Sequence, residues 1–382
     1  MAVRAIERLS VRDLSPRVSD ALLTVETAAP TRGMIVERVI PRPGVDFATH
    51  GFLQPEDTAF VARDEAGQVA GFATVKLRQA FFDGQPATVS YLANVHVHPG
   101  YQRRGIGSAL LRDCVAYGEE AGATVHWGAV EPGNQASLGN FHKAGFVDAR
   151  PIRAVGFPVG YLAGQDTAPG LAFRVATPEH LAEAAALLNR FYDGYNFWRP
   201  LTGEDLRLAL GGGGASRNYT PEDLVAVLDA SGAVRAVALI YDQSRIARRI
   251  VEEVRVPGFG LLACLRPLFR LSPGYRSLPR IGADYPKLFL HYFAAADRGS
   301  AHCLLAGVAR EWQRRARDWP DDRRPVLAVC QDDANLLGVR FGLLGAVGFA
   351  LGKGAYPSHV HVLLKTDLPF DADRHNWLNF WT

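Results

Sequence analysis

One stretch of the chain decides its fold: Val95-His96-Val97-His98-Pro99-Gly100-Tyr101-Gln102-Arg103-Arg104-Gly105-Ile106-Gly107-Ser108. Residues 89–97 alternate and are rich in Val, Tyr and Leu, which predicts a strand, and the apolar residues from Ile106 to Val115 recur with helical spacing. The N–H groups of a helix's first turn point outward with the positive end of the helix dipole, and a glycine there removes the Cβ that would hold a phosphate away. The stretch therefore predicts a phosphate-binding turn between a strand and a helix, with Arg103 and Arg104 adding positive charge.

The spacing Gln102-x-x-Gly105-x-Gly107, placed after a V-x-V-x-P strand, resembles the acyl-CoA pyrophosphate loop of the GNAT superfamily of N-acyltransferases. Residues 126–130 read as a further strand. The family's N-x-x-A-x-x-x-Y-x-K-x-G-F pattern follows, with Ser for Ala and Phe for Tyr, at Asn134, Ser137, Phe141, Lys143 and Gly145-Phe146. On these motifs the first half of the chain is identified as a member of the family.

The same plan occurs a second time along the chain. Three pairs of segments match in the same order: 61–73 with 227–238, 104–111 with 298–305, and 134–146 with 335–349. Such ordered matches indicate an internal duplication. The second copy carries an insertion around residues 256–285, which reads as an extra loop or a short helix.

The length of 382 residues suits two domains better than one core. The polar run 164–170, marked by Pro and Gly, is the predicted linker, which gives a GNAT domain with the acetyl-CoA site at 1–165 and a GNAT-like domain at 166–382. The predicted fold class is α/β (an α+β mixed sheet): two tandem GNAT-like domains, each a mostly antiparallel sheet flanked by helices. Tandem GNAT proteins of the mycothiol synthase type are similar in arrangement.

The second copy is predicted to be degenerate. Gly299 and Ala301 keep the glycine pattern of the turn, but Ala296 replaces Gln102. Phe289, His291 and Phe293 are aligned with Val95, Val97 and Pro99. We expect these bulky rings to close the cofactor channel of that copy.

Composition is that of a soluble globular protein, with 48% hydrophobic and 21% charged residues. No apolar stretch approaches the roughly 18 residues of a spanning helix, and the N-terminus lacks a signal-peptide core, so we expect a cytoplasmic protein with no membrane partner. The net charge of +3 is too small to favour nucleic acid, and the Arg-rich runs 245–249 and 310–317 read as solvated helix faces. A monomer and a homodimer both remain open.

Cysteine and histidine spacing favours no metal site. Cys114, Cys264, Cys303 and Cys330 form no C-x-x-C pair, and we expect buried free thiols. His96 with His98, and His359 with His361, form H-x-H pairs that lack a third ligand with clear spacing.

The resemblance implies acetyl-CoA as co-substrate, with the backbone N–H of Val95 meeting the thioester carbonyl, that of Val97 binding the pantetheine arm, and the turn binding the pyrophosphate. The cofactor-binding residues expected on this basis are Val95, His96, Val97, Gln102, Arg103, Arg104, Gly105, Ile106, Gly107, Ser108, Asn134 and Ser137.

The catalytic residues depart from the family's pattern. Many members have a glutamate where this chain has Tyr91, and the family's tyrosine acid is Phe141 here. Tyr91, predicted by alternation to share the face of Val95, and Glu131, at the end of the next strand, are the candidate proton carriers beside Val95. Tyr101 and the carboxylate of Thr382, at the end of an aromatic tail, are further candidates.

Two functions follow from the resemblance. The first is an N-acetyltransferase that moves an acetyl group from acetyl-CoA to a primary amine of a small molecule or peptide by direct attack. The second, favoured by the absent Glu and Tyr, is a non-catalytic acyl-CoA-binding or sensor protein.

Overall fold

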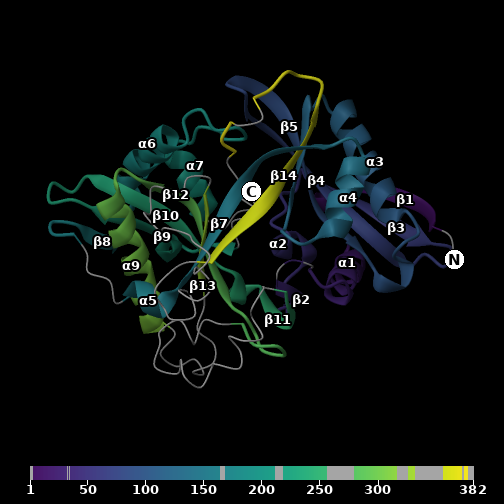
Figure 1. The fold of residues 1–382 in the computed structure, drawn as a ribbon, viewed down its shortest axis with the longest axis horizontal. Coiled ribbons are helices and arrows are strands. Elements are labelled where there is room, and N and C mark those ends of the chain that lie inside the picture. Colours follow the sequence, from purple (N-terminus) through teal and green to yellow (C-terminus); the bar gives the residue numbers. More distant parts are fainter. Residues whose placement is uncertain are drawn as a thin grey trace. The chain divides into compact units, whose positions relative to one another are not determined.

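A computed structural model describes residues 3–31, 33, 35–163, 168–210, 218–255, 279–315, 326–331, 356–371 and 374–376. The chain divides into two compact units (Figure 1). Unit 1 comprises Met1–Ile152, Gly194–Arg199 and Val360–Thr382, and unit 2 comprises Arg153–Asp193 and Pro200–His359. The predicted boundary between residues 165 and 166 lies outside the described residues and stays a prediction.

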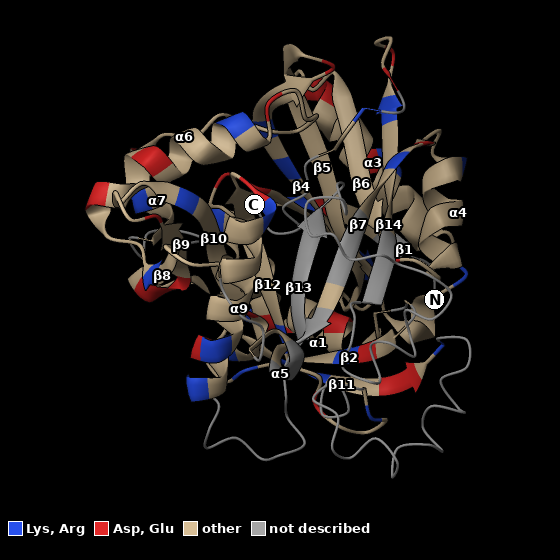
Figure 2. Ribbon diagram, turned by 60° about the vertical axis from the view of Figure 1, so that its left-hand side comes forward, with Lys and Arg blue, Asp and Glu red and all other residues tan. Residues whose placement is uncertain are grey.

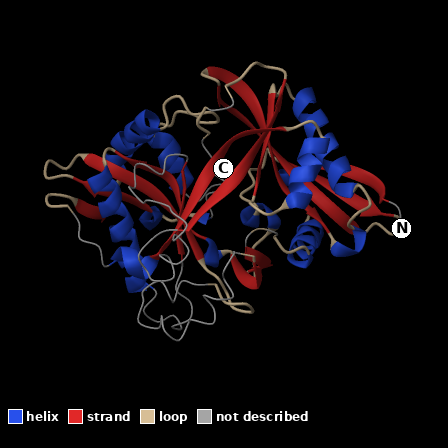
Figure 3. Cartoon of the chain, in the orientation of Figure 1, coloured by secondary structure: helices blue, strands red, loops and turns tan. Residues whose placement is uncertain are grey.

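Both units contain helices and strands, as Figure 3 shows. The helices are α1 (Pro16–Ala28), α2 (Phe47–His50), α3 (Ile106–Glu120) and α4 (Gln135–Lys143) in unit 1, and α5 (Val159–Ala163), α6 (Leu181–Phe191), α7 (Gly203–Leu210) and α9 (Arg298–Arg315) in unit 2. The strands of unit 1 are β1 (Val3–Ser10), β2 (Ile35–Pro41), β3 (Thr58–Asp64), β4 (Val69–Phe82), β5 (Gln85–Val97) and β6 (Val125–Val130). Those of unit 2 are β8 (Ala172–Val175), β9 (Leu224–Leu228), β10 (Val234–Asp242), β11 (Ala247–Val254), β12 (Lys287–Ala295) and β13 (Val326–Gln331). Two strands, β7 (Val147–Pro158) and β14 (Tyr356–Thr366), have residues in both units.

The sheet of unit 1 has the order β1-β3-β4-β5-β6-β14 and is antiparallel except between β5 and β6. One face carries α3 and α4, whose apolar residues, such as Leu110 and Phe141, pack with Val75 and Leu92. The other face carries α1 and α2, where Leu22 and Phe47 pack against Phe72 of β4. The apolar residues whose helical spacing predicts α3 are therefore the ones that pack this helix against the sheet.

Unit 2 repeats this order with β7-β13-β12-β10-β9-β8, and its parallel pair is β12 with β13. Its core lies between the sheet and α5 and α9, with Leu288, Leu304 and Leu305 among the buried residues. The described part of the chain thus confirms the predicted fold class.

Each unit takes its last strand from the other half of the sequence. In unit 1, His361–Thr366 of β14 pairs with Val125–Val130 of β6, although β14 comes after all of unit 2's other strands. In unit 2, Arg153–Pro158 of β7 pairs with Val326–Gln331 of β13. Besides the short segment Gly194–Arg199, which also belongs to unit 1, the chain therefore crosses between its two units at these strands.

The hairpin that begins the duplication is the same in both units. Gly67 and Gly232 both have left-handed φ, at 79° and 88°. Their N–H groups donate to the carbonyls of Asp64 and Asp229, at 3.0 Å in each case. The glycines are needed because this φ is strained for any residue with a Cβ.

Other sequence expectations have mixed outcomes. Cys114 and Cys303 are buried free thiols, as predicted, and most of the predicted insertion, residues 256–278, lies outside the described residues. Of the two Arg-rich runs predicted as solvated helix faces, residues 310–315 lie on the helix α9, whereas residues 247–249 lie on the strand β11. Arg245 donates to the buried carboxylate of Asp223 at 2.5 Å, and Arg315 donates to Glu311 at 2.8 Å. Figure 2 shows both charge signs interspersed over the described ribbon. Within that described part, no helix is both long and apolar enough to span a membrane.

Candidate acyl-CoA site

A β-bulge marks the middle of the site. The β4–β5 register pairs Thr74 with Ala93 but Phe72 with His96, so β5 carries one extra residue. Asn94 lies in this bulge with a left-handed φ of 52°. A bulge re-aims the side chains that follow it and locally increases strand twist.

The bulge changes which β5 residues share a face. Leu92, Val95 and Val97 all pack on the core beneath α3 and α4, whereas His96 stacks on Phe72 on the α1 and α2 side, with 5.3 Å between ring centroids. Tyr91 lies opposite Lys76 and on the face away from Leu92. The expectation that Tyr91 shares the face of Val95 is therefore wrong, because simple alternation does not hold across an inserted residue.

The parallel ladder between β5 and β6 is short. It pairs Val89 with Val125, Ser90 with His126 and Tyr91 with Trp127, and within the described residues it extends no further. Beyond Tyr91, β6 pairs only on its other side, with β14. The β5 backbone from the bulge to Val97 is thus left without a strand partner on the β6 side, where a cofactor arm can bind the main chain.

The predicted phosphate turn follows β5 directly. A 3-10 helix, η2 (Pro99–Tyr101), leads into Gln102 to Gly105, and α3 begins at Ile106. Arg103 and Gly105 have left-handed φ values of 63° and 79°. No side chain caps α3, and among the described residues the backbone N–H groups of Gly105, Ile106, Gly107 and Ser108 have no protein acceptor. The turn therefore presents a set of free donors at the positive end of a helix dipole, which favours an anion.

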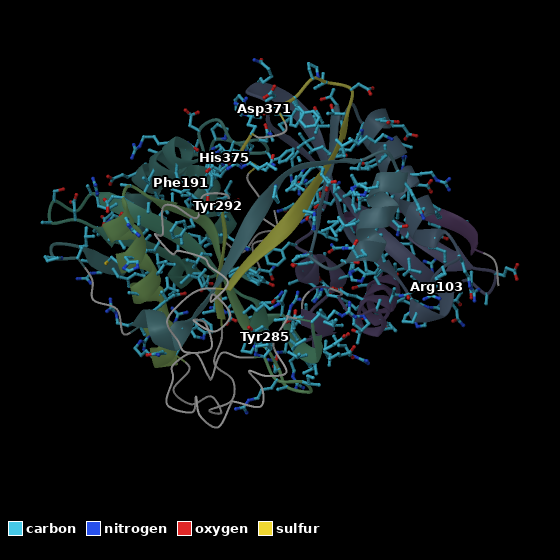
Figure 4. All side chains as sticks on the ribbon, viewed as in Figure 1. Arg103, Phe191, Tyr285, Tyr292, Asp371 and His375 are labelled. Atoms are coloured by element: carbon cyan, nitrogen blue, oxygen red, sulfur yellow. The ribbon has the colours of Figure 1, made fainter. Side chains whose placement is uncertain are left out.

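The turn is fixed to its surroundings by side chains. Tyr101 donates to Asp64 at 2.6 Å, and Gln102 Nε2 donates to the carbonyl of Val97 at 3.2 Å. Arg104 donates to the carbonyl of Gly100 at 3.0 Å and lies over the Tyr101 ring. Arg103, labelled in Figure 4, is exposed and has no acidic partner among the described residues. Of the two arginines, Arg103 is the one available to a ligand.

The second motif lies on α4. Asn134 caps this helix by accepting from the N–H of Ser137 at 3.2 Å, and Asn140 accepts from the Ser108 hydroxyl of α3 at 3.1 Å. Phe141 is buried at 3% exposure. Its ring edge lies so close to Gly128 of β6 that a Cβ on that glycine would be 2.5 Å away.

The structure brings the two candidate proton carriers, Tyr91 and Glu131, near each other. Tyr91 is buried and stacks on Trp127 with 4.2 Å between ring centroids. Burial, followed by the nearby charge of Glu131, raises the pKa of the Tyr91 phenol. Glu131 itself is exposed at the end of β6. A raised pKa keeps the Tyr91 phenol protonated at neutral pH, so the group carries a proton there, although it is a weaker acid than a free phenol.

Tyr101 has a different environment. The hydrogen bond to Asp64 raises the pKa of the Tyr101 phenol and lowers that of the Asp64 carboxyl. Because this hydroxyl is already donated, Tyr101 holds the turn rather than serving as a free acid.

Sequence reasoning missed two segments of unit 1. Phe197, from the segment Gly194–Arg199, stacks on Trp127 with 4.4 Å between centroids and 8° between ring planes. Asn196 accepts from the N–H of Asp83 at 2.8 Å, and Arg374 donates to Asp83 at 2.8 Å. These residues lie about 50 or more positions from the motifs, and no local pattern marks them. The predicted docking of the tail is seen as far as Asn376, whereas Thr382 lies outside the described residues.

Unit 2 carries the same bulge without the turn. Tyr292, labelled in Figure 4, has a φ of 48°, and the β10–β12 register shifts around it as it does around Asn94. The bulge therefore equates Phe293 with Val95 and Ala295 with Val97. The sequence alignment of Phe289, His291 and Phe293 with Val95, Val97 and Pro99 is thus out of register, because it ignored the length of the following loop.

That loop is where the two units differ most. Residues 98–105 separate β5 from α3, but only residues 296 and 297 separate β12 from α9. Asp297 accepts from the N–H of Ser300 at 2.8 Å, and its carboxyl pKa is lowered, first by that bond. A carboxylate thus occupies the end of α9 that corresponds to the free donors of α3, and it repels a phosphate.

Metal ligands do not gather in the described part of the chain, where no group of three or more His, Cys, Asp or Glu side chains has a suitable arrangement. His98 instead accepts from the N–H of Gly100 at 3.2 Å.

Comparison with known proteins agrees with this geometry. Residues 30–146 match the acetyltransferase (GNAT) family. An L-amino acid N-acyltransferase, MnaT, of Escherichia coli K12 is 34% identical over 97 residues, which are 25% of this chain and 55% of the relative, so the chain spans about half the length of this curated relative.

Two solved structures share the fold over nearly the whole chain. A tandem GNAT protein from the clavulanic acid biosynthesis pathway has a TM-score of 0.55 at 15% identity, covering 96% of this chain and 100% of its own. N-myristoyltransferase of Saccharomyces cerevisiae with bound myristoyl-CoA has a TM-score of 0.57 at 10% identity, covering 95% of this chain and 83% of its own. Residues 30–146 of the chain therefore carry a domain of the acetyltransferase (GNAT) family.

Proposed function

We propose that the chain is an N-acetyltransferase that moves the acetyl group of acetyl-CoA to a primary amine of a small molecule or peptide. The observation that carries the proposal is the turn before α3, with four backbone donors that have no protein acceptor in the described chain, directly after a strand that has left its β6 partner. This is the arrangement that a long, anionic, acylated cofactor requires, with one end on a helix N-terminus and the other along a free strand edge.

In this proposal the turn from Gln102 to Ser108 binds the pyrophosphate, and Arg103 adds a charge from solvent. Val95 and Val97 offer main-chain N–H groups to the thioester carbonyl and to the pantetheine arm. A donor aimed at the thioester oxygen stabilises the negative charge that develops there during attack. Asn134 and Ser137 form the hydrogen-bonded cap at the start of α4.

One cofactor binds per chain, in unit 1. Unit 2 lacks a counterpart of residues 98–105, and Asp297 caps the helix that would meet the phosphates.

The transfer itself is a direct displacement. The amine nitrogen forms a C–N bond to the thioester carbon, the C–S bond breaks, and the nitrogen loses a proton as the sulfur gains one. Tyr91 donates the proton to the sulfur, since burial keeps its phenol protonated, and Glu131 receives the nitrogen's proton through water. Phe141, which has no hydroxyl, takes no part in proton transfer.

The names of related proteins support an amine acceptor and an acyl-CoA donor. The E. coli relative is named for L-amino acids, and the yeast structure holds myristoyl-CoA. This chain has Tyr91 and Phe141 where many family members have a glutamate and a tyrosine. These differences favour the alternative of a non-catalytic acyl-CoA sensor, so the test must separate binding from turnover.

Calorimetry with acetyl-CoA on the full chain measures the first part, and we expect one site per chain. Two equal sites would contradict the assignment of unit 2, and no binding would contradict the whole proposal. Release of free CoA in the presence of an amine panel measures the second part. Binding of acetyl-CoA without release of CoA by any amine would favour the sensor.

A further inference from the structure

A buried lysine lies beside the bulge of β5. Lys76 is on β4, directly opposite Tyr91 in the antiparallel ladder, so the two side chains are neighbours on the same face of the sheet. That face is covered by α1 and α2. Lys76 is 1% exposed, which is rare for a lysine without a carboxylate in contact.

The hydrogen bonds of Lys76 fit an uncharged amine. Its Nζ donates to the carbonyl of Phe52 at 2.9 Å, and this is its one hydrogen bond among the described residues. An ammonium has three N–H donors, and leaving two of them buried without acceptors is costly. A neutral amine has two donors and a lone pair, so it leaves fewer donors unmet and keeps a site that can accept a proton.

The amine lies on the same side as the bulge. Phe52 follows Gly51, where a Cβ would be 3.3 Å from Asn94 Nδ2. Asn94 Nδ2 donates to the Thr74 hydroxyl at 3.2 Å, which donates to the carbonyl of Ala93 at 3.1 Å. Lys76, the end of α2 and the bulge therefore lie close together on the face that α1 and α2 cover.

The neighbouring charges do not balance the positive charge that a protonated Lys76 would carry. Burial lowers the pKa of the Lys76 amine to about 7, with a raising effect from Asp57 and a lowering effect from Arg78. Asp57 is itself engaged by Arg78, at 2.7 Å and 3.1 Å. The other titratable groups that the structure places on this face are Tyr91 and His96 of β5 and the pair of Glu26 on α1 with His50 on α2, which are 3.1 Å apart.

We propose that Lys76 is the base that removes the first proton from the acceptor's ammonium group before attack. The inference rests on the proposed function and adds a residue that the family resemblance does not supply. An alkylammonium with a pKa of about 10.4 must lose a proton before its nitrogen can attack. A neutral amine beside the bulge, where the proposed function puts the thioester, is suited to accept it.

The protons then balance. The acceptor nitrogen starts with three protons and ends with one. Lys76 takes the first and later releases it to solvent, which is the net proton of the reaction. The second leaves after the C–N bond forms and passes to Glu131, while Tyr91 gives its proton to the departing sulfur and recovers one from Glu131.

The test compares Lys76→Met with Lys365→Met in the full chain, using two acceptors. Lys365 lies on β14 and takes no part in the site. One acceptor is an alkyl amine, and the other is an aromatic amine or a hydroxylamine, which is already neutral at neutral pH. With the alkyl amine, Lys76→Met should lower kcat/KM about 100-fold at neutral pH, the usual effect of losing a general base. The kcat/KM of this variant should then rise with pH only as the alkylammonium loses its proton in solution.

With the neutral acceptor, the kcat/KM of Lys76→Met should be close to that of the unsubstituted protein. Both variants should bind acetyl-CoA normally. A merely structural lysine would slow both acceptors alike, and that result would overturn the proposal. If Lys76→Met does not fold, NMR titration of the lysine side chains of the unsubstituted protein decides instead. A Lys76 amine with the ordinary lysine pKa would also overturn the proposal. An unchanged protein that releases no CoA with any amine contradicts the proposed function itself, whereas full activity of Lys76→Met contradicts only the role of Lys76.

Discussion

Tyr101 donates its phenolic hydroxyl to the Asp64 carboxylate over 2.6 Å and so joins the phosphate turn to the β3–β4 hairpin. The same carboxylate accepts from the N–H groups of Ala66 and Gln68, so it also closes the hairpin. The position of the turn thus depends on a hairpin that is distant in sequence.

Tyr101→Phe removes this connection while leaving the ring over which Arg104 lies. We expect a several-fold rise in the Kd for acetyl-CoA, because the turn must then be ordered by the cofactor itself. Tyr117→Phe is the control, since Tyr117 accepts a hydrogen bond from Thr58 and does not touch the turn. Calorimetry on both variants measures the effect, and equal affinities would contradict it.

Gly105→Ala should weaken acetyl-CoA binding tenfold or more, as a Cβ then stands where the phosphate meets the backbone. Its φ of 79° also predicts a loss of folding stability of about 1 kcal/mol from left-handed strain. Gly122→Ala is the matched control, with a φ of 81° just beyond the other end of α3 and open space around its Cβ position. Thermal unfolding should show similar losses in both, and a similar loss of affinity in both would refute the phosphate assignment.

Arg103→Ala should lower acetyl-CoA affinity at low salt, with the difference shrinking as salt rises, because attraction between exposed charges is screened. Arg104→Ala should also lower affinity, but with a part that does not depend on salt, since Arg104 holds the turn through Gly100. Arg112→Ala, on the exposed side of α3, is the control. Unchanged affinity of Arg103→Ala at low salt would show that Arg103 only solvates the start of the helix.

Tyr91→Phe and Glu131→Gln should each reduce turnover by about 100-fold while acetyl-CoA binding stays near normal. An acceptor that is neutral from the start should not restore either variant, because both act after the first proton has left. Single-turnover kinetics with an identified amine checks this. If both variants and a chain shortened by its last two residues keep full turnover, proton transfer by these groups is excluded.

The stability of the chain should depend on Lys76 in a defined pH range. Its folded pKa of about 7 lies below the unfolded value, so between these pH values the unfolded chain binds a proton that the folded chain does not. The free energy of unfolding should therefore rise from pH 7 toward pH 10, by up to about 1.4 kcal/mol per pH unit from this group. Denaturant unfolding at several pH values gives the slope of the unfolding free energy against pH for the unsubstituted protein and for Lys76→Met. Equal slopes in the two proteins would refute the prediction.

The strand, turn and helix around the phosphate site follow from local sequence. Alternation in β5, the left-handed requirement at Gly105 and the helical spacing after Ile106 are properties of neighbouring residues, so the pattern is sufficient. The repeated hairpin at Gly67 and Gly232 is predictable for the same reason.

The bulge and its consequences are not local in this sense. An Asn at position 94 can stay in the regular ladder or leave it, and only pairing with β4 settles which, so the faces of Tyr91 and Val95 were misassigned. The alignment of Arg298 and Gly299 with Arg104 and Gly105 likewise compared residue types and overlooked the loop length. No local pattern marks Lys76, whose burial depends on the covering of its face by α1 and α2.

The exchanged strands bear on how the acetyl-CoA half can be isolated. A fragment ending near residue 165 would lack Val360–Thr366, and the edge of β6 would be open to any other strand in solution. It would also lack Phe197, so one face of the Trp127 ring would meet water. Such a fragment is expected to aggregate when expressed alone, and a gene cut at the apparent repeat boundary would divide both folding units. A circular permutation that places residues 360–376 ahead of residue 3 would keep the missing strand with its sheet.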